Sequence, residues 1–376
     1  MTSKKLYSIH SRRRQQGLSL IELMISITLG LIILAAIVQV LISSKNAFVL
    51  ERENAILQEN ARFAMDTLRR EVGVGGSTGC RNDSPIANLI GDTSTDPTIR
   101  EPGITGYEHE DDATARPEHF PDDINEDSDA LIVRYADVSN GTPSTIIDRA
   151  LGALNNLVID PTSLIDLDLA NGDIAVLTSP DCGAVISLSL SEINASSAVV
   201  AVTNCVDSTL SSLSLAAILG LLGGGLDCST GGLPELPTLA DYQIAKFYST
   251  SYYIAPSSLD PTVPALWHYQ TSAGEGGGTS EELVQGIENM QILYGLDSDT
   301  PSDSYPNQYV KADTIADSDW SRVVSIRISL LIRSILPTDL VAVSQQDFEG
   351  IAIPADRFTR RQITSVIHMK NMGAIQ

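Results

Sequence analysis

The feature that most constrains this chain is an apolar run over residues 18–42, LSLIELMISITLGLIILAAIVQVLI, which contains one charged side chain, Glu22. A helix of this length rises about 37 Å, which is enough to cross the hydrocarbon core of a bilayer. Backbone groups in lipid must form hydrogen bonds within their own segment. The run therefore predicts one membrane-spanning helix.

The charge distribution predicts how this helix is oriented. Five basic residues and no acidic residue lie in the first 17 positions, whereas the whole chain has a formal net charge of -23. Basic flanks stay on the cytoplasmic side, so the rest of the chain is expected in the periplasm. An acidic body repels a phosphate backbone, which argues against nucleic acid as a partner.

Two simpler explanations exist for such a segment. A secretory signal would have a shorter apolar region followed by a small-residue cleavage site, but here the small residue, Gly17, precedes the run. A plain membrane anchor gives no reason for Glu22. An acidic side chain at full depth in lipid costs roughly 2.5–3.5 kcal/mol.

The helical pattern continues beyond the apolar run. No Pro or Gly occurs from Leu31 to Val72, and Gly73, Gly75 and Gly76 follow as helix terminators. Apolar residues in the second half recur mostly every three or four positions, which predicts an amphipathic helix with one buried stripe. The stripe consists of Leu50, Leu57, Ala61, Ala64, Leu68 and Val72, with Asn54 as a polar exception.

The residues around the start of the run, Gln16-Gly17-Leu18-Ser19-Leu20-Ile21-Glu22-Leu23, resemble the processing site of type IV prepilins and type II secretion pseudopilins. The resemblance implies that prepilin peptidase cleaves after Gly17 and that Leu18, the new N-terminus, is methylated. It also implies that Glu22, the fifth residue of the mature chain, is needed for filament assembly.

Further segments are similar to the PilW family of minor pilins. These are Gln58–Ala64 with Gly79-Cys80, Ser128–Tyr135, Leu283–Met290 with Tyr294–Asp297, and Trp320–Val324. Residues 138–240 fit that family poorly. The resemblance implies a pilin-like fold and a structural role in a filament.

The body of the chain predicts β-structure. Residues 324–330 alternate strictly between apolar and polar side chains, and weaker strands are expected at 174–177, 198–203, 252–255 and 363–367. We expect an α+β fold, in which an antiparallel sheet packs on the amphipathic half of the helix. The apolar stretch Leu210–Leu226 is shorter than a span needs. It is interpreted as a buried helix or loop, with a surface patch used in assembly as the alternative.

The domain organisation follows from these boundaries. Residues 1–17 form the leader, 18–42 the transmembrane half of the helix and 43–76 its amphipathic half. Residues 77–376 form a periplasmic globular domain with a divergent region at 138–240.

The four cysteines, Cys80, Cys182, Cys205 and Cys228, favour disulfides in a periplasmic domain and allow three pairings. Cys182 and Cys205 flank two predicted strands that could form a hairpin. We therefore predict the pair Cys182–Cys205 and, with it, Cys80–Cys228.

No residue is predicted to be catalytic, and we expect no enzyme. Gly75–Gly79 matches the pattern G-x-S-x-G, but a helix precedes it where a hydrolase needs a strand. Asp297, Asp299 and Asp303 form a candidate calcium site in a loop. A second acidic series contains Asp123, Asn125, Asp127 and Asp129, and solvated acidic loops are the alternative for both.

The function predicted from these observations is that of a minor type IV pilin in pilus assembly, in an initiation or tip complex. Its expected partners are prepilin peptidase, other minor pilins and major pilins. It is expected in the inner membrane and then in the filament or at its tip. The alternatives are a large minor pseudopilin of type II secretion and a membrane-anchored periplasmic enzyme or adhesin. An enzyme anchor would not need Glu22, and this residue distinguishes that alternative from a filament subunit.

Overall fold

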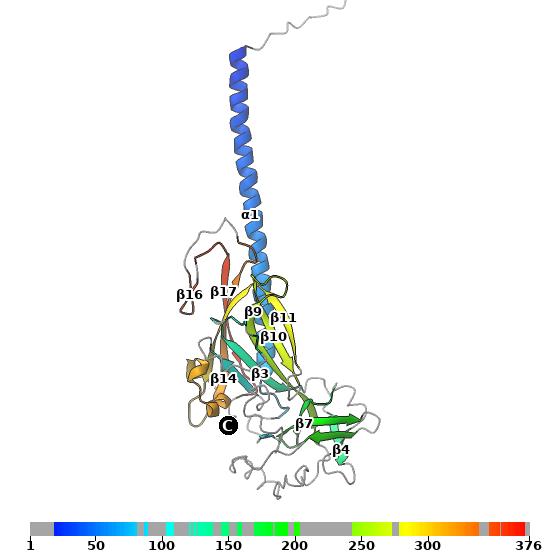
Figure 1. The fold of residues 1–376 in the computed structure, drawn as a ribbon. Helices are drawn as coiled ribbons and strands as arrows, with labels where there is room; N and C mark the ends of the chain where they lie inside the picture. The colour runs from blue at the N-terminus through cyan, green and yellow to red at the C-terminus, as the bar shows by residue number, and fades with distance from the viewer. Residues whose placement is uncertain are drawn as a thin grey trace, which may run out of the picture. The chain divides into compact units, whose positions relative to one another are not determined.

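The computed structural model describes residues 19–80, 86–88, 103–108, 120–121, 123–125, 127–137, 144–149, 156–159, 169–182, 185–194, 199–203, 243–272, 278–337, 346–353 and 355–372. The chain divides into two compact units, residues 1–54 and 55–376. Figure 1 shows the helix and strands of both units.

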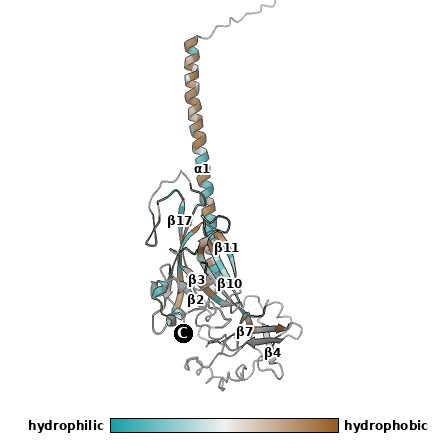
Figure 2. Cartoon of the chain, viewed as in Figure 1, coloured by the Kyte–Doolittle hydropathy of each residue, from teal (hydrophilic) through white to brown (hydrophobic). Residues whose placement is uncertain are grey.

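One helix, α1 (Leu20–Val74), contains both the apolar run and the predicted amphipathic segment. Its first half is brown over most of its length in Figure 2, and the apolar side chains there are exposed. Among the described residues, α1 is the helix that is long and apolar enough to cross a membrane. The helix extends two residues beyond the predicted end at Val72, because Gly73 remains helical and Gly75 begins the turn.

The second half of α1 buries one stripe, as the sequence predicts. The predicted positions from Leu57 to Val72 are all buried, and Met65 and Thr67 widen the stripe. Buried residues of this stripe share one hydrophobic cluster with the strands of the body. Burial of this face, rather than helix propensity, stabilises this part of the helix.

A four-stranded antiparallel sheet contributes to the same cluster as α1. Its order is β13 (Gln308–Val310), β12 (Ile287–Leu296), β14 (Val323–Arg333) and β17 (Arg360–His368). Ile326, Ile328 and Leu330 of β14 are fully buried in that cluster. The strand predicted at residues 324–330 is confirmed, although burial does not alternate along it, because Ser325 and Ser329 are buried as well.

The larger sheet has eleven strands, and β9 (Gln243–Pro256) connects its two parts. The first part of β9 pairs with β4 (Ser144–Arg149) and β6 (Ile174–Thr178), and its later part with β3 (Ala130–Ala136) and β10 (Pro264–Thr271). The remaining strands are β1 (Ile86–Asn88), β2 (Gly103–Tyr107), β5 (Asn156–Ile159), β7 (Val185–Asn194), β8 (Val199–Thr203) and β11 (Thr279–Gln285).

Smaller elements complete the body. β15 (Gln346–Phe348) and β16 (Ile351–Ile353) form a hairpin, and η4 (Ala312–Thr314) and η5 (Asp317–Arg322) are short 3-10 helices. The described ladders are antiparallel except for the parallel pair β1–β7. The expected α+β fold is confirmed.

The four weaker strand predictions also correspond to strands, namely β6, β8, β9 and β17. The divergent region 138–240 contributes β4 to β8 to the large sheet. Leu210–Leu226 lies outside the described residues, so its predicted burial stays a prediction.

Candidate functional site

The first candidate site is the start of α1. The amide of Leu23 donates to the carbonyl of Ser19 at 3.1 Å, which opens the helix, and Glu22 lies in its first turn. The Ser26 hydroxyl donates to the Glu22 carbonyl at 2.7 Å, so this polar side chain is satisfied locally within the apolar half. An acidic side chain here is favoured by the positive end of the helix dipole.

Gly17 and Leu18, the predicted cleavage and methylation positions, lie outside the described residues. Their roles remain predictions that rest on the sequence.

The second notable feature is the exit from α1. Gly76 has a φ of +78°, and a Cβ there would lie 2.8 Å from the Asn371 carbonyl oxygen, so only glycine fits without strain. The amide of Gly76 donates to the Arg134 carbonyl at 2.9 Å, and that of Ala136 donates to the Ser77 carbonyl at 2.7 Å. The exit segment is therefore held alongside β3.

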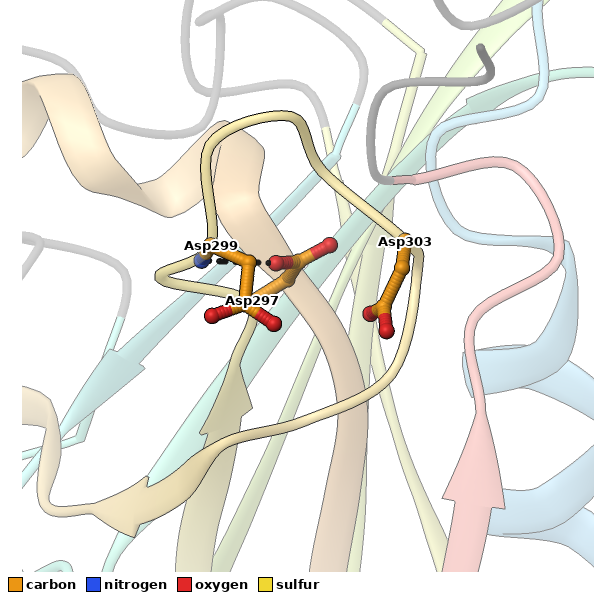
Figure 3. Close-up of side chains that lie close together, drawn as sticks. All are labelled: Asp297, Asp299 and Asp303. Atoms are coloured by element: carbon orange, nitrogen blue, oxygen red, sulfur yellow. Dashed lines mark hydrogen bonds between the residues drawn. The ribbon is translucent and has the colours of Figure 1, made fainter.

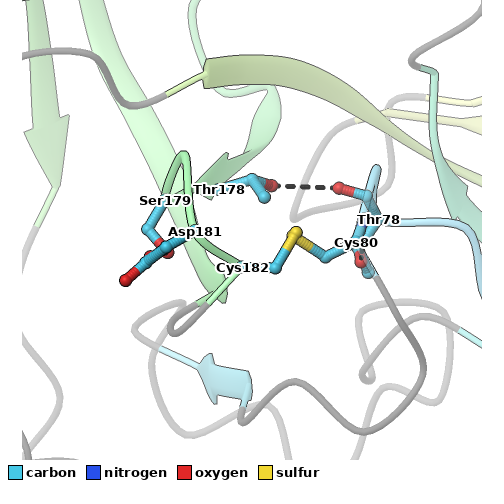
Figure 4. Close-up of a disulfide and its surroundings, with 6 residues drawn as sticks. All are labelled: Thr78, Cys80, Thr178, Ser179, Asp181 and Cys182. Carbon is cyan, nitrogen blue, oxygen red and sulfur yellow. Dashed lines mark hydrogen bonds between the residues drawn. A yellow bond between two sulfur atoms is a disulfide. The ribbon is translucent and has the colours of Figure 1, made fainter.

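A disulfide joins this exit segment to the large sheet. Cys80 is bonded to Cys182, with their Cα atoms 5.5 Å apart, and the Thr178 hydroxyl donates to the Thr78 carbonyl at 2.9 Å beside them (Figure 4). The predicted pairs Cys182–Cys205 and Cys80–Cys228 are wrong.

The error in pairing has a physical cause. The two strands after Cys182, β7 and β8, do pair antiparallel. However, Cys182 lies in the turn between β6 and β7, and that turn is next to the end of α1. Cys205 and Cys228 lie outside the described residues.

The third candidate site is the acidic loop after β12. Ligand oxygens of Asp297, Asp299 and Asp303 lie within 4.8 Å of one another, so the structure brings the predicted residues together (Figure 3). The Asp297 side chain is buried and accepts hydrogen bonds from the Ser302 hydroxyl at 2.5 Å and the Ser304 amide at 2.7 Å.

These donors, the Ser302 hydroxyl foremost, lower the pKa of Asp297 below its usual 3.8. The geometry assigns Asp297 the role of organising its own loop. Calcium binding by the three carboxylates stays a prediction.

The other acidic series has a structural role that the sequence did not indicate. The Asn125 amide group donates to the Glu288 carbonyl at 2.8 Å, and Asp129 accepts a bond from the Ile292 amide at 2.7 Å. Both side chains thus fasten the loop before β3 to β12.

A charged cluster at the start of β17 was also missed. Arg360 donates to both carboxylate oxygens of Glu288, at 2.6 and 2.8 Å, and to both of Asp356, at 2.5 and 2.6 Å. The side chain of Arg360 is 3% exposed. These residues are 72 and 4 positions away from Arg360, and the longer separation leaves no local pattern in the sequence.

Comparisons with known proteins give two family matches, one at the N-terminal site and one in the body of the chain. A family model for the prokaryotic N-terminal methylation motif matches residues 12–38, and one for Type IV Pilus-assembly protein W matches residues 251–371. The second match runs from β9 to β17. No curated protein matches the chain.

A solved structure, the Type IV-like pilin TTHA1219 from Thermus thermophilus, is similar at 12% identity and a TM-score of 0.23. The alignment covers 57% of this chain and 95% of that one.

The motif, the exposed apolar helix and the antiparallel body together define a pilin-like protein that is anchored by its N-terminal helix. The two family matches indicate, more particularly, a minor type IV pilin in pilus assembly, with similarity to Type IV Pilus-assembly protein W over residues 251–371. They do not favour the type II secretion or anchored-enzyme alternatives.

Proposed function

We propose that this protein is cleaved by prepilin peptidase between Gly17 and Leu18, methylated on Leu18, and incorporated with other pilins into an initiation or tip complex. Before assembly, α1 spans the inner membrane with the basic leader in the cytoplasm and residues 77–376 in the periplasm. The region 138–240, which precedes the PilW match, provides a surface particular to this subunit.

The observation that carries this proposal is Glu22, the one charged side chain in the exposed apolar half of α1. Cleavage creates a positive amine on Leu18, four positions and about one helical turn from Glu22. Inside an apolar bundle of helices, an unpaired charge is costly, and pairing between adjacent subunits offsets much of that cost. The pairing would also set the axial offset between neighbouring helices.

The test compares Glu22→Ala with the wild type by membrane fractionation and by immunoblotting of sheared filaments. We expect normal insertion and cleavage, because the variant helix is more apolar, but a loss of about tenfold or more in filaments. Equal incorporation of the two proteins would refute the assembly role of Glu22.

The matched control is Gly17→Leu, which should block cleavage and keep the amine from forming. Mass spectrometry of the mature N-terminus checks the cut directly. A chain that still begins at Met1, or one that begins near Ala47, would contradict the proposed processing.

A further inference from the structure

The two edges of the four-stranded sheet differ. β13, at one edge, has three residues, whereas β17, at the other, has nine and pairs with β14 from Ser325 to Arg333. Within the described residues, β17 pairs with β14 and with no second strand. An unpaired edge of this length is a template for pairing with another chain.

The backbone groups of β17 that point away from the sheet follow from its register. The amide of Met369 donates to the Val324 carbonyl at 2.8 Å, and the ladder continues without a shift from Ser325↔His368 to Arg333↔Arg360. In an antiparallel strand, the N–H and C=O groups of one residue point to the same side, and those of the next residue point to the other side. The residues that face the free edge are Gln362, Thr364, Val366 and His368.

These four residues are all exposed, and Val366 is 57% exposed. Between Gln362 and His368 the strand carries no proline, no bulge, and no lysine, arginine or acidic side chain. These are the devices by which edge strands usually avoid pairing. The middle of the β17 edge, from Gln362 to His368, thus lacks the ordinary protection.

The margin of this edge is basic although the protein is strongly acidic. Arg361 and Lys370 are exposed, and neither forms an ion pair within the described part of the chain. Arg69 of α1 donates to the Ser365 hydroxyl at 2.8 Å, so the exposed flank of α1 adjoins β17. A basic margin on a chain of net charge -23 favours an acidic partner segment.

We propose that the free edge of β17 accepts an extended, acidic segment of a neighbouring pilin subunit as a fifth strand. This inference rests on the proposed function, which places another subunit against α1. Main-chain hydrogen bonds at Thr364 and Val366 hold the added strand, and Arg361 and Lys370 attract its acidic side chains.

The decisive comparison is Val366→Pro against Val366→Thr in the full-length protein, measured by incorporation into sheared filaments. Proline removes an amide that points to the free edge and leaves the β14 ladder intact, whereas threonine keeps that amide. We expect a fall of about tenfold for proline and a change within about twofold for threonine. Wild-type incorporation of Val366→Pro overturns the proposal.

Hydrogen exchange of the wild type gives a second readout that needs no variant. The amides of Thr364 and Val366 should exchange at least about tenfold more slowly in filaments than in the detergent-solubilised subunit. Those of Ile363 and Ser365, which face β14, should be slow in both. Equal exchange at Thr364 and Val366 in the two states overturns the proposal even if Val366→Pro folds poorly.

A charge reversal completes the test. Arg361→Glu with Lys370→Glu should reduce incorporation several-fold at low salt and less at high salt. The two proposals fail in distinguishable ways. Absence of the wild type from filaments overturns both, whereas incorporation of Val366→Pro together with loss of Glu22→Ala overturns strand addition and leaves the proposed function standing.

Discussion

Cys80 and Cys182 are 102 positions apart in the chain, and their disulfide fastens the end of α1 to the turn between β6 and β7. Cys80 lies six residues after the last helical residue, Val74, so the bond keeps the helix exit close to the large sheet. A filament subunit is anchored through its helix, which makes this junction the connection between the anchor and the body.

Replacing both Cys80 and Cys182 by serine should lower the free energy of unfolding by roughly 2–5 kcal/mol, because the unfolded chain regains the freedom of a long loop. Guanidinium unfolding of the purified protein measures this. Thr178→Val is the matched control, because it removes the neighbouring hydrogen bond to Thr78 and keeps the covalent link. It should cost about 1 kcal/mol. Peptide mapping without reductant that found Cys182 bonded to Cys205 would contradict this arrangement.

Arg360→Met should destabilise the body by about 3–5 kcal/mol, because it leaves the carboxylates of Glu288 and Asp356 without their shared cation. Arg360→Lys retains the charge but loses the bidentate geometry, so it should cost less. Thermal unfolding of the two variants at neutral pH provides the comparison. A lysine variant destabilised as much as the methionine variant would show that the positive charge alone does not supply the stabilisation, which then depends on the bidentate geometry and packing of the guanidinium.

Stability should fall on acidification below about pH 4, in part through Asp297 and Asp356. Hydrogen bonds, from Ser302 and Arg360 respectively, lower the pKa of both carboxyls below 3.8. A carboxyl with a depressed pKa stabilises the fold above its usual pKa and loses that contribution as pH falls through the lowered value. Asp297→Asn should therefore lower the free energy of unfolding at neutral pH. It should also make that free energy less dependent on pH below about pH 4.

The same variant tests the calcium prediction. If the three carboxylates bind calcium, millimolar Ca²⁺ should raise the melting temperature of the wild type and leave that of Asp297→Asn unchanged. An equal response of both proteins would exclude this loop as the site. No response in the wild type would indicate a loop held by its own hydrogen bonds.

Gly106→Ala should be destabilising by about 1–3 kcal/mol or more, because the new Cβ would lie 2.0 Å from the Tyr294 hydroxyl oxygen. That hydroxyl is buried and has no hydrogen-bond partner in the described part of the chain. Tyr294→Phe should then be neutral or stabilising. In a double-mutant cycle, Tyr294→Phe should relieve part of the Gly106→Ala cost. If the effects of the two substitutions on the free energy of unfolding were strictly additive, the cost of Gly106→Ala would not come from its contact with the Tyr294 hydroxyl.

Much of the fold was predictable because it depends on local periodicity. The apolar run, the buried stripe from Leu57 to Val72 and the alternation of β14 are all patterns within one segment, and each predicted its own element. Glu22 was identified in the same way, since a lone carboxylate in an apolar helix is conspicuous without any knowledge of the body. The grouping of Asp297, Asp299 and Asp303 was also local, because one loop carries all three.

The features that only the tertiary structure decided join segments far apart in the chain. The bond between Cys80 and Cys182, the contact of Arg360 with Glu288, and the free edge of β17 depend on which strands become neighbours. Hydrophobic burial drives that choice, and it is non-directional, so many pairings satisfy the same apolar pattern. The sequence therefore determined the helix, its charged residue and the strands β6, β8, β9, β14 and β17, while the packing of the strands determined which side chains meet and which edge stays open.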